Sequence, residues 1–472
     1  MVLVAAATVR VETGRPLAQG GSASPRSGSG SCSASGGART ERVDVGTDGA
    51  EVQAPILRAA LSANGRFVAF SSAADNVVPN DTNGEVDVFV RDLRRRLTML
   101  VSVSSAGEQG NRASFYPSIS ADGRFVAFRS YATNLVEGDD NRVEDVFVHD
   151  RLTGETERVS VGPGGREADG PSITSSISAD GSIVAFSSEA TNLVPEDWNG
   201  ARDVFVRDRV HERTIRVSVG YEGEADGASE ASSLSADGHV VGFRSFASNL
   251  VPHDSNRLAD TFVRDWTAGV TERVNVSSSG KQANRPTFRV SVSGDGRWVA
   301  FRSRASNLVR GDTNNALDVF EHDRRTGKTT RVSVATGGAQ ADSHGLGWSA
   351  RSTRFMSRPF LSRDGRFAAF GSRAANLVAG DTNGEPDVFV HDLRTGKTVR
   401  VSVSARGRQA NEGSYVAGIS ANGRVVAFLS SAANLVRGDT NRDRDVFVRV
   451  RGRREAASAA CGAGTDIRAD VP

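Results

Sequence analysis

Lysine, cysteine and long apolar runs are all scarce in this sequence. The 58 basic residues include three lysines, Lys281, Lys328 and Lys397, and the formal net charge is +2. This near balance argues against nucleic acid or an anionic membrane surface as a partner. No stretch approaches the roughly 18–20 consecutive apolar residues that a membrane helix needs, so we expect no membrane span.

Motifs that mark common enzyme classes are also missing. The sequence has no Gly-x-Ser-x-Gly elbow in a strand-turn-helix setting, no Cys-x-x-Cys pair and no phosphate-binding glycine loop. The histidines do not compensate, because His149, His322 and His391 take a place after "DVFV" or "DVFE" where other copies have arginine. They are spread along the chain and predict no metal cluster. We expect no catalytic role for His211, His239 or His253 either.

One phrase is written seven times. It reads "ALSANGRFVAF" or "SISADGRFVAF", and its glycines are separated by 58, 58, 57, 58, 69 and 58 residues. These glycines are Gly65, Gly123, Gly181, Gly238, Gly296, Gly365 and Gly423. Two further phrases, "DVFV" and "ERVSV", recur seven times in step with it. A fixed long period is the mark of a repeat architecture.

Each repeat predicts four β-strands. "RFVAF" and "DVFV" are short, aromatic and β-branched, and "TERVSV" alternates polar and apolar residues. "ADG" or "ANG" predicts a type I′ hairpin turn, "TG" a second turn, and the segment before the glycine a fourth strand. Four-stranded units without helical periodicity predict an all-β fold, a seven-bladed β-propeller over residues 40–450.

The order of the phrases predicts how the ring closes. An "ERV" phrase stands at residues 41–45 before any glycine phrase, and none follows the last "DVFV" at 445–448. We therefore expect the first strand to complete the seventh blade beside residues 445–450, which removes an open sheet edge.

The ends of the chain are expected to lie outside the propeller. "MVLVAAATV" makes a poor signal peptide, and the Gly/Ser-rich residues 16–39 predict a flexible leader over residues 1–39, with a C-terminal tail over 451–472. Ring closure would bring Cys32 and Cys461 to the same edge. They would form a disulfide in an oxidising compartment, and two separate thiols in the cytoplasm are the alternative.

"SADGRFVAF", "DVFVHD" and "TG" at these offsets resemble the TolB-type, WD-repeat-like β-propeller repeats of bacteria, over about residues 40–450. The resemblance implies a protein- or ligand-binding scaffold, commonly outside the cytoplasm, with no fixed catalytic residues. The chain departs from TolB itself, whose propeller has six blades and a preceding domain.

Every repeat also carries Asp-x-Asn followed by Asp four residues later, from Asp81, Asn83 and Asp87 to Asp439, Asn441 and Asp445. Such residues hold loops through Asx-turns, and the sevenfold recurrence favours this architectural role. Weak calcium sites at these loops are the alternative, since closely spaced oxygens suit Ca²⁺. Apart from this calcium alternative, we expect no cofactor.

Function is expected where the copies differ. The spacing of 69 reflects an insertion that contains His344, Trp348 and Met356. Near the start of the innermost strand, the copies read Arg58, Tyr116, Thr174, Ala231, Arg289, Arg358 and Val416, preceded in three copies by Phe115, Phe288 and Tyr415. Arginine and aromatic residues at a concave rim suit recognition of carboxylates, sugars or peptide ends. The predicted binding residues are Arg58, Tyr116, Arg289, His344, Trp348, Arg358 and Tyr415, and ordinary loop variation is the alternative.

These features predict a monomeric, non-enzymatic scaffold that binds a protein, peptide or glycan, in the periplasm or secreted. A cytoplasmic location stays open. One alternative is a propeller-fold lyase or glycan hydrolase with an acid–base pair at the channel mouth, where Glu230 is the one acid expected. Another is a calcium-stabilised structural protein.

Overall fold

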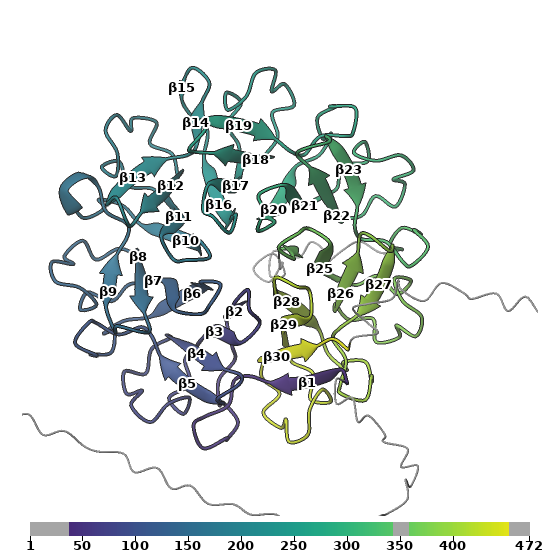
Figure 1. The fold of residues 1–472 in the computed structure, drawn as a ribbon, viewed down its shortest axis with the longest axis horizontal. Coiled ribbons are helices and arrows are strands. Elements are labelled where there is room, and N and C mark those ends of the chain that lie inside the picture. The colour runs from purple at the N-terminus through teal and green to yellow at the C-terminus, as the bar shows by residue number, and fades with distance from the viewer. Residues whose placement is uncertain (1–36, 343–357, 453–472) are drawn as a thin grey trace, which may run out of the picture. The chain divides into compact units, whose positions relative to one another are not determined.

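The recurring phrases are strands in the computed structural model, which describes residues 37–342 and 358–452. Seven four-stranded sheets follow one another around an axis, and every strand pair within them is antiparallel (Figure 1). The predicted seven-bladed β-propeller is confirmed. We number the blades from the sheet that contains β2.

Within blades 1–6 the strands follow the chain from the axis outward (Figure 1). Blade 1 contains β2 (Arg58–Leu61), β3 (Phe67–Ser72), β4 (Asp87–Asp92) and β5 (Leu97–Leu100). Blade 2 contains β6 (Ser114–Ile119), β7 (Phe125–Ser130), β8 (Asp145–Asp150) and β9 (Thr156–Arg158). Blade 3 contains β10 (Ser172–Ile177), β11 (Ile183–Ser188), β12 (Asp203–Asp208) and β13 (Arg213–Arg216).

The remaining blades repeat this plan. Blade 4 contains β16 (Ser229–Leu234), β17 (Val240–Ser245), β18 (Asp260–Asp265) and β19 (Val270–Arg273). Blade 5 contains β20 (Thr287–Val292), β21 (Trp298–Ser303), β22 (Asp318–Asp323) and β23 (Lys328–Arg331). Blade 6 contains β24 (Phe360–Leu361), β25 (Phe367–Ser372), β26 (Asp387–Asp392) and β27 (Lys397–Arg400). Blade 7 contains β28 (Ser414–Ile419), β29 (Val425–Ser430), β30 (Asp445–Val450) and β1 (Arg39–Arg42). A short hairpin, β14 (Val219–Gly220) and β15 (Gly223–Glu224), and one 3₁₀ turn, η1 (Pro163–Gly165), lie in connections.

The ring closes as the phrase order predicted. β1 pairs antiparallel with β30, from Arg39 opposite Val450 to Arg42 opposite Phe447. One residue further, the amide of Val43 donates to the carbonyl of Val446 at 2.8 Å. Val43 is fully buried in a core cluster that joins blades 7 and 1. The N-terminal strand therefore protects the edge that blade 7 would otherwise expose.

A pair of phenylalanines fills the centre of every blade. The second and third strands place them directly opposite each other, as with Phe70 and Phe89. The ring centroids lie 5.5–6.0 Å apart and the rings are stacked in all seven blades. The recurring "VAF" and "DVF" phrases thus supply the core, because both phenylalanines point to the same buried face of the sheet.

The turn between the first two strands differs from the prediction. A type I′ turn needs positive φ at both central residues, but in these turns only the glycine has positive φ, between 69° and 83°. In blade 1 the amide of Gly65 donates to the carbonyl of Ser62, and the amide of Ser62 donates to the carbonyl of Phe67. The type I′ prediction was wrong because the loop is longer than a two-residue hairpin and needs one left-handed residue.

These turns also join the blades. The amide of Ala121 donates to the carbonyl of Ala179 in the next turn at 2.9 Å, and the amide of Ala421 donates to Ala63 across the closure at 2.8 Å. A backbone hydrogen bond joins every pair of neighbouring turns around the ring, although the donor is one residue later at Asn64 and Asp295. Packing between neighbouring blades therefore explains part of the recurring phrase.

The glycine of this turn is expected to be essential for that packing. A Cβ atom on Gly181 would lie 2.1 Å from Cδ2 of Phe125 in the preceding blade, at a φ of +79°. We expect Gly181→Ala to lower the free energy of unfolding by about 2–4 kcal/mol, since it combines left-handed strain with overpacking. Denaturant titration measures this. Gly200→Ala is the control, because Gly200 has φ +62° but a Cβ atom on it would meet no other atom within 4 Å, and a loss as large as that of Gly181→Ala would contradict the packing argument.

Several sequence predictions lie outside the described residues. They concern the leader up to residue 36, the tail from residue 453, Cys32, Cys461, and the insertion residues His344, Trp348 and Met356. Among the residues that the structure describes, no helix is long and apolar enough to cross a membrane.

Candidate functional site

The innermost strands surround a pocket of about 320 Å³ on the propeller axis. Its lining comes from the innermost strands, including β2, β6, β16, β20 and β28, together with a few residues of neighbouring loops and second strands. These innermost strands are the ones nearest the centre in Figure 1. The pocket lies toward the end where they begin, which is also the end where one blade connects to the next.

The structure brings together most of the predicted binding residues. Arg58, Tyr116, Arg289, Arg358 and Tyr415 all line this one pocket, although they come from five different blades. The other two predicted residues, His344 and Trp348, lie outside the described residues. Sequence reasoning missed three further arginines in the lining, which are Arg129, Arg202 and Arg444. No signal near the innermost strand could have found them, since they come from β7 and from loops.

β-Bulges in the innermost strands shape the pocket wall. The pairing register shifts between Phe115 and Ser118 in blade 2 and between Phe288 and Val290 in blade 5. The residues at these shifts, Tyr116 and Arg289, have φ values of 53° and 40°. Among the described residues, they are the two non-glycine residues with positive φ inside strands. Strained backbone of this kind clusters at functional sites, where it directs particular side chains.

The pocket is strongly cationic. Its described lining contains six arginines, Arg58, Arg129, Arg202, Arg289, Arg358 and Arg444, and one acidic residue, Glu230. Some of this charge is compensated, because Arg202 lies 3.4 Å from Glu230 and Arg129 lies 3.2 Å from Glu144. Arginine nevertheless outnumbers acid in and around the pocket.

Burial, and after it the charges of neighbouring arginines, shift the pKa values of these groups. Burial lowers the pKa of Arg358 to about 10, and the charges of Arg289 and Arg58 add to this effect. Burial and then the charge of Arg58 likewise lower the pKa of Arg289. For Tyr116, burial acts to raise the pKa, but the charge and hydrogen bond of Arg58, helped by Arg129 and Arg289, lower it overall. The pocket thus favours negative charge.

Aromatic rings hold several of these arginines. The guanidinium of Arg58 lies 4.8 Å and that of Arg129 lies 4.3 Å from the centre of the Tyr116 ring. Arg58 also donates a hydrogen bond to the Tyr116 hydroxyl at 3.4 Å. Cation–π contacts fix the orientation of a guanidinium while leaving its N–H edge available for hydrogen bonding.

Two exposed aromatic residues contact side chains close to these arginines. Tyr131 follows β7 and packs edge-on against Phe115, and Phe246 follows β17 beneath the guanidinium of Arg244 at 4.4 Å. Their relative exposures are 39% and 56%. They offer flat apolar surface next to charged groups, which suits rings of a sugar or of a side chain.

Comparisons with known proteins find similar solved structures but no match in sequence. No protein-family profile and no curated protein matches the chain. Among solved structures, it is similar to TolB from Acinetobacter baumannii, with 14% identity, a TM-score of 0.38, and coverage of 71% of this chain and 66% of that one. The chain thus spans just under two thirds of that TolB.

Two other solved structures are also similar. A TolB protein from Agrobacterium tumefaciens is 15% identical, with a TM-score of 0.38 and coverage of 76% and 96% of the two chains. Oligogalacturonate lyase from Vibrio parahaemolyticus is 12% identical, with a TM-score of 0.49 and coverage of 88% and 97%. The chain's own strand pairing makes it a seven-bladed β-propeller. At these identities and TM-scores the likenesses do not indicate what this chain binds or does.

The predicted acid–base pair of an enzyme is not found in this pocket. Glu230 is the only carboxylate among its described lining residues, and no histidine accompanies it. Glu230 instead lies 3.4 Å from Arg202 and 3.9 Å from Arg244. The described histidines His149, His322 and His391 are buried, and each forms a 2.9 Å hydrogen bond to a threonine of the adjacent outer strand.

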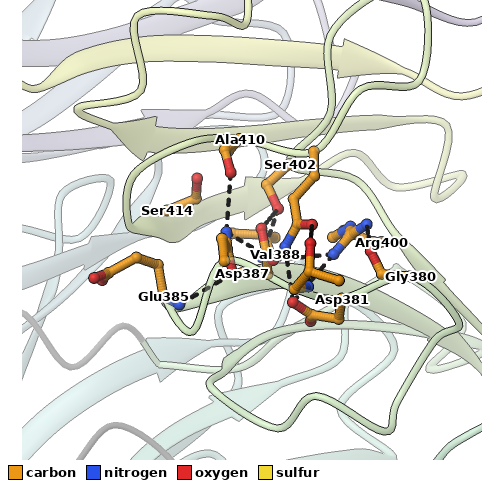
Figure 2. A network of polar contacts seen from close by, with 12 residues as sticks. Gly380, Asp381, Glu385, Asp387, Val388, Arg400, Ser402, Ala410 and Ser414 are labelled. Carbon is orange, nitrogen blue, oxygen red and sulfur yellow. Dashed lines mark hydrogen bonds and ion pairs between the residues drawn. The ribbon is translucent and has the colours of Figure 1, made fainter.

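The Asp-x-Asn residues form a second kind of site, a polar cage in each blade, which Figure 2 shows for blade 6. Asp381 and Asp387 flank the guanidinium of Arg400, whose Nη1 lies 3.3 Å from an oxygen of each. Asn383 accepts a hydrogen bond from the amide of Glu385 at 3.0 Å, which is an Asx-turn. The contact of Asn383 is of the kind that the architectural interpretation predicted.

Arginine takes the place of a metal ion in two of these cages. Glu51, Asp439 and Asp445 form one group of carboxylates at metal-binding spacing, and Asp139, Asp145 and Glu167 form another. In the first, Nη1 of Arg42 lies 2.5 Å from Glu51, and in the second, Nη1 of Arg158 lies 2.7 Å from Glu167. Sequence reasoning missed these two arginines, because they stand in the "ERV" phrase, far along the chain from the Asp-x-Asn loop.

The cages predict an unusual pH dependence of stability. Burial and neighbouring carboxylates raise the pKa of Asp139 to about 7 and those of Asp197 and Asp312 to about 6. A raised folded-state pKa contributes stability that is full below about pH 4 and is lost as pH rises through the folded value. We expect this contribution to the free energy of unfolding to decline between about pH 4 and pH 7. Urea titrations at pH 5 and pH 7.5 measure the decline, and Asp139→Asn should reduce it; an unchanged decline in that variant would contradict the assignment.

Proposed function

We propose that this protein is a binding protein whose axial pocket takes the carboxylate groups of an anionic ligand. The observation that carries this proposal is the set of six arginines and one acid around a single pocket. The two sources of such carboxylates are an acidic glycan and an acidic peptide segment. Both fit the predicted scaffold function.

Gathering buried guanidinium groups in one pocket costs folding free energy. Burial and mutual repulsion lower the pKa values of Arg289, Arg358 and Arg444, so the charged forms of these side chains are destabilised where they lie. A carboxylate ligand would offset this repulsion and accept charge-assisted hydrogen bonds, which arginine can form in bidentate geometry. Binding energy and relief of strain would then come from the same contacts.

The aromatic residues beside the arginines support a ligand with flat rings or faces. Tyr116 and Tyr415 line the pocket. Tyr131 and Phe246 are exposed and contact Phe115 and Arg244. A short uronic-acid oligosaccharide combines carboxylates with stacking faces, and an acidic peptide combines carboxylates with a backbone. We further propose that the protein is a monomer and that it does not bind nucleic acid. We also propose that it acts outside the cytoplasm, as the repeat resemblance implies.

Calorimetric titration with matched ligands tests the proposal. One arm compares a uronic-acid trisaccharide with its methyl-esterified, uncharged form, and the other compares a glutamate-rich peptide with its glutamine counterpart. We expect at least one acidic form to bind, its neutral partner to bind at least about tenfold more weakly, and the affinity to fall between low and high salt. Equal binding of a neutral form, tighter binding of inorganic phosphate, or no binding of either acidic ligand would contradict it.

The enzyme alternative lacks the predicted pair of carboxylates, or of a histidine and a carboxylate, among the described pocket residues. β-Elimination or glycoside hydrolysis requires a positioned base or acid beside the reacting bond. Glu230, the one carboxylate of the lining, is paired with Arg202 and Arg244. We therefore propose binding without catalysis.

A further inference from the structure

Blade 1 differs from the other six blades at one position of the polar cage. The last residue of its outer strand, opposite Phe89, is Leu100. The equivalent residue in blade 6, opposite Phe389, is Arg400. The other five blades also have arginine there, namely Arg158, Arg216, Arg273, Arg331 and Arg42. Leu100 is thus the single exception in an aligned set of seven.

The rest of the blade 1 cage matches blade 6. Nε2 of Gln109 donates to Asp81 and to Asp87 at 2.8 Å each. In blade 6, Gln409 makes the same two contacts at 2.7 and 3.1 Å. Leu100 therefore removes a positive charge from the cage without rebuilding the scaffold that holds the two carboxylates.

This leaves two buried carboxylates side by side. Asp81 is 5% exposed and Asp87 is fully buried. Oδ2 of Asp81 is buried and has no hydrogen-bond partner among the described residues. Burial, together with the charge of Asp87, raises the pKa of Asp81 to about 6 against the opposing hydrogen bond from Gln109. Gln109 contacts both carboxylates, and no ion pair joins either of them to a basic side chain of the described residues.

Arg400 of blade 6 shows which atoms surround the position where blade 1 lacks a positive charge. Nη1 of Arg400 lies between Asp381 and Asp387, and Nη2 donates to the carbonyl of Gly380 at 3.1 Å. By the repeat alignment, the corresponding groups in blade 1 are the carboxylates of Asp81 and Asp87 and the carbonyl of Asn80. All of these groups offer oxygen atoms as metal ligands, and such hard ligands suit Ca²⁺ rather than a soft transition metal.

We propose that blade 1 binds a divalent cation of the calcium class between Asp81 and Asp87, at the place that a guanidinium takes in the other six blades. Two carboxylates balance the charge of one such ion. The ion would fix the loop between β3 and β4. This loop already contacts the connection that enters blade 2, because the side chain of Asn83 donates to the carbonyl of Gly110 at 2.8 Å. This site is separate from the axial pocket and does not rest on its proposed function.

Thermal unfolding at pH 7.5 with calcium or with chelator tests the proposal. For the full chain we expect calcium to raise Tm by at least about 3 °C, since a ligand that binds the folded state stabilises it by mass action. Leu100→Arg should raise Tm in the presence of chelator and abolish the calcium response, because it supplies the missing guanidinium. Asp81→Asn should also abolish the response.

Met99→Arg is the matched control. Met99 is the exposed neighbour of Leu100 on β5, so the variant adds the same charge outside the cage and should keep the full calcium response. The proposal is overturned if the wild-type chain shows no calcium response, or if Leu100→Arg retains it, which would assign the ion to another cage. A wild-type Tm that rises when the pH is lowered to 5.5 but not when calcium is added would also overturn it.

Discussion

A chain that begins at Gly46, without the closing strand, is expected to lose at least about 5 kcal/mol of folding free energy, which is on the scale of the whole stability of many domains. β1 supplies four ladder positions to β30, and the residue after it, Val43, is fully buried between blades 7 and 1. β1 also supplies Arg42, the guanidinium that lies among Glu51, Asp439 and Asp445. Its loss would leave buried carboxylates without their cation and a sheet edge unpaired.

Circular dichroism during heating measures this effect, with sedimentation to detect association through the exposed edge of β30. A chain that begins at Gly37 is the control, because it keeps all of β1, and it should melt like the full chain. Val43→Asp is a second probe that removes no strand and should cost about 3–5 kcal/mol through an uncompensated buried charge. Similar melting of all these chains would contradict closure by β1.

Arg289→Met is expected to weaken binding of the acidic ligand by about tenfold to a hundredfold, since a hydrogen bond to a charged group contributes about 1.5–3 kcal/mol. The same variant should keep or raise Tm. Arg289 is buried among like charges, and its pKa is lowered by burial and by Arg58. A residue that is needed for binding but unfavourable for folding is the signature of a binding site.

The control for this variant is Arg94→Met, which makes the same change of charge in the exposed turn between β4 and β5. It should leave the affinity unchanged within a factor of about two. Titration calorimetry gives the affinities and scanning calorimetry gives Tm. Equal losses in both variants would show that only net charge matters, and a large fall in the Tm of Arg289→Met would show that this arginine is structural.

The fold was predictable from the sequence because its strongest signals are periodic. The seven copies of each phrase set the blade count, and the early "ERV" phrase indicated the closure, which β1 and β30 confirm. The turn type was not predictable in the same way. "ADG" has the composition of a two-residue hairpin, but the position of Gly181 is set by contact with Phe125 of the preceding blade, and this contact is invisible to local pattern.

The candidate site was predictable only in part, for a similar reason. Departure from the repeat pointed to Arg58, Tyr116 and Arg289, which do line the pocket. Arg202 and Arg444 could not be found, because they come from loops whose distance from the axis depends on packing around the whole ring. The arginine cages were also missed, since the partners Arg400 and Asp381 lie in different phrases.

A crystal structure of the chain with the acidic ligand of highest affinity tests most directly whether the axial pocket binds carboxylates. We expect a carboxylate of that ligand to lie within hydrogen-bonding distance of the guanidinium of Arg289 or of another arginine that lines the axial pocket. A ligand bound at the outer rim of the blades, or one that enters the pocket with an uncharged part while its carboxylates face solvent, would contradict it.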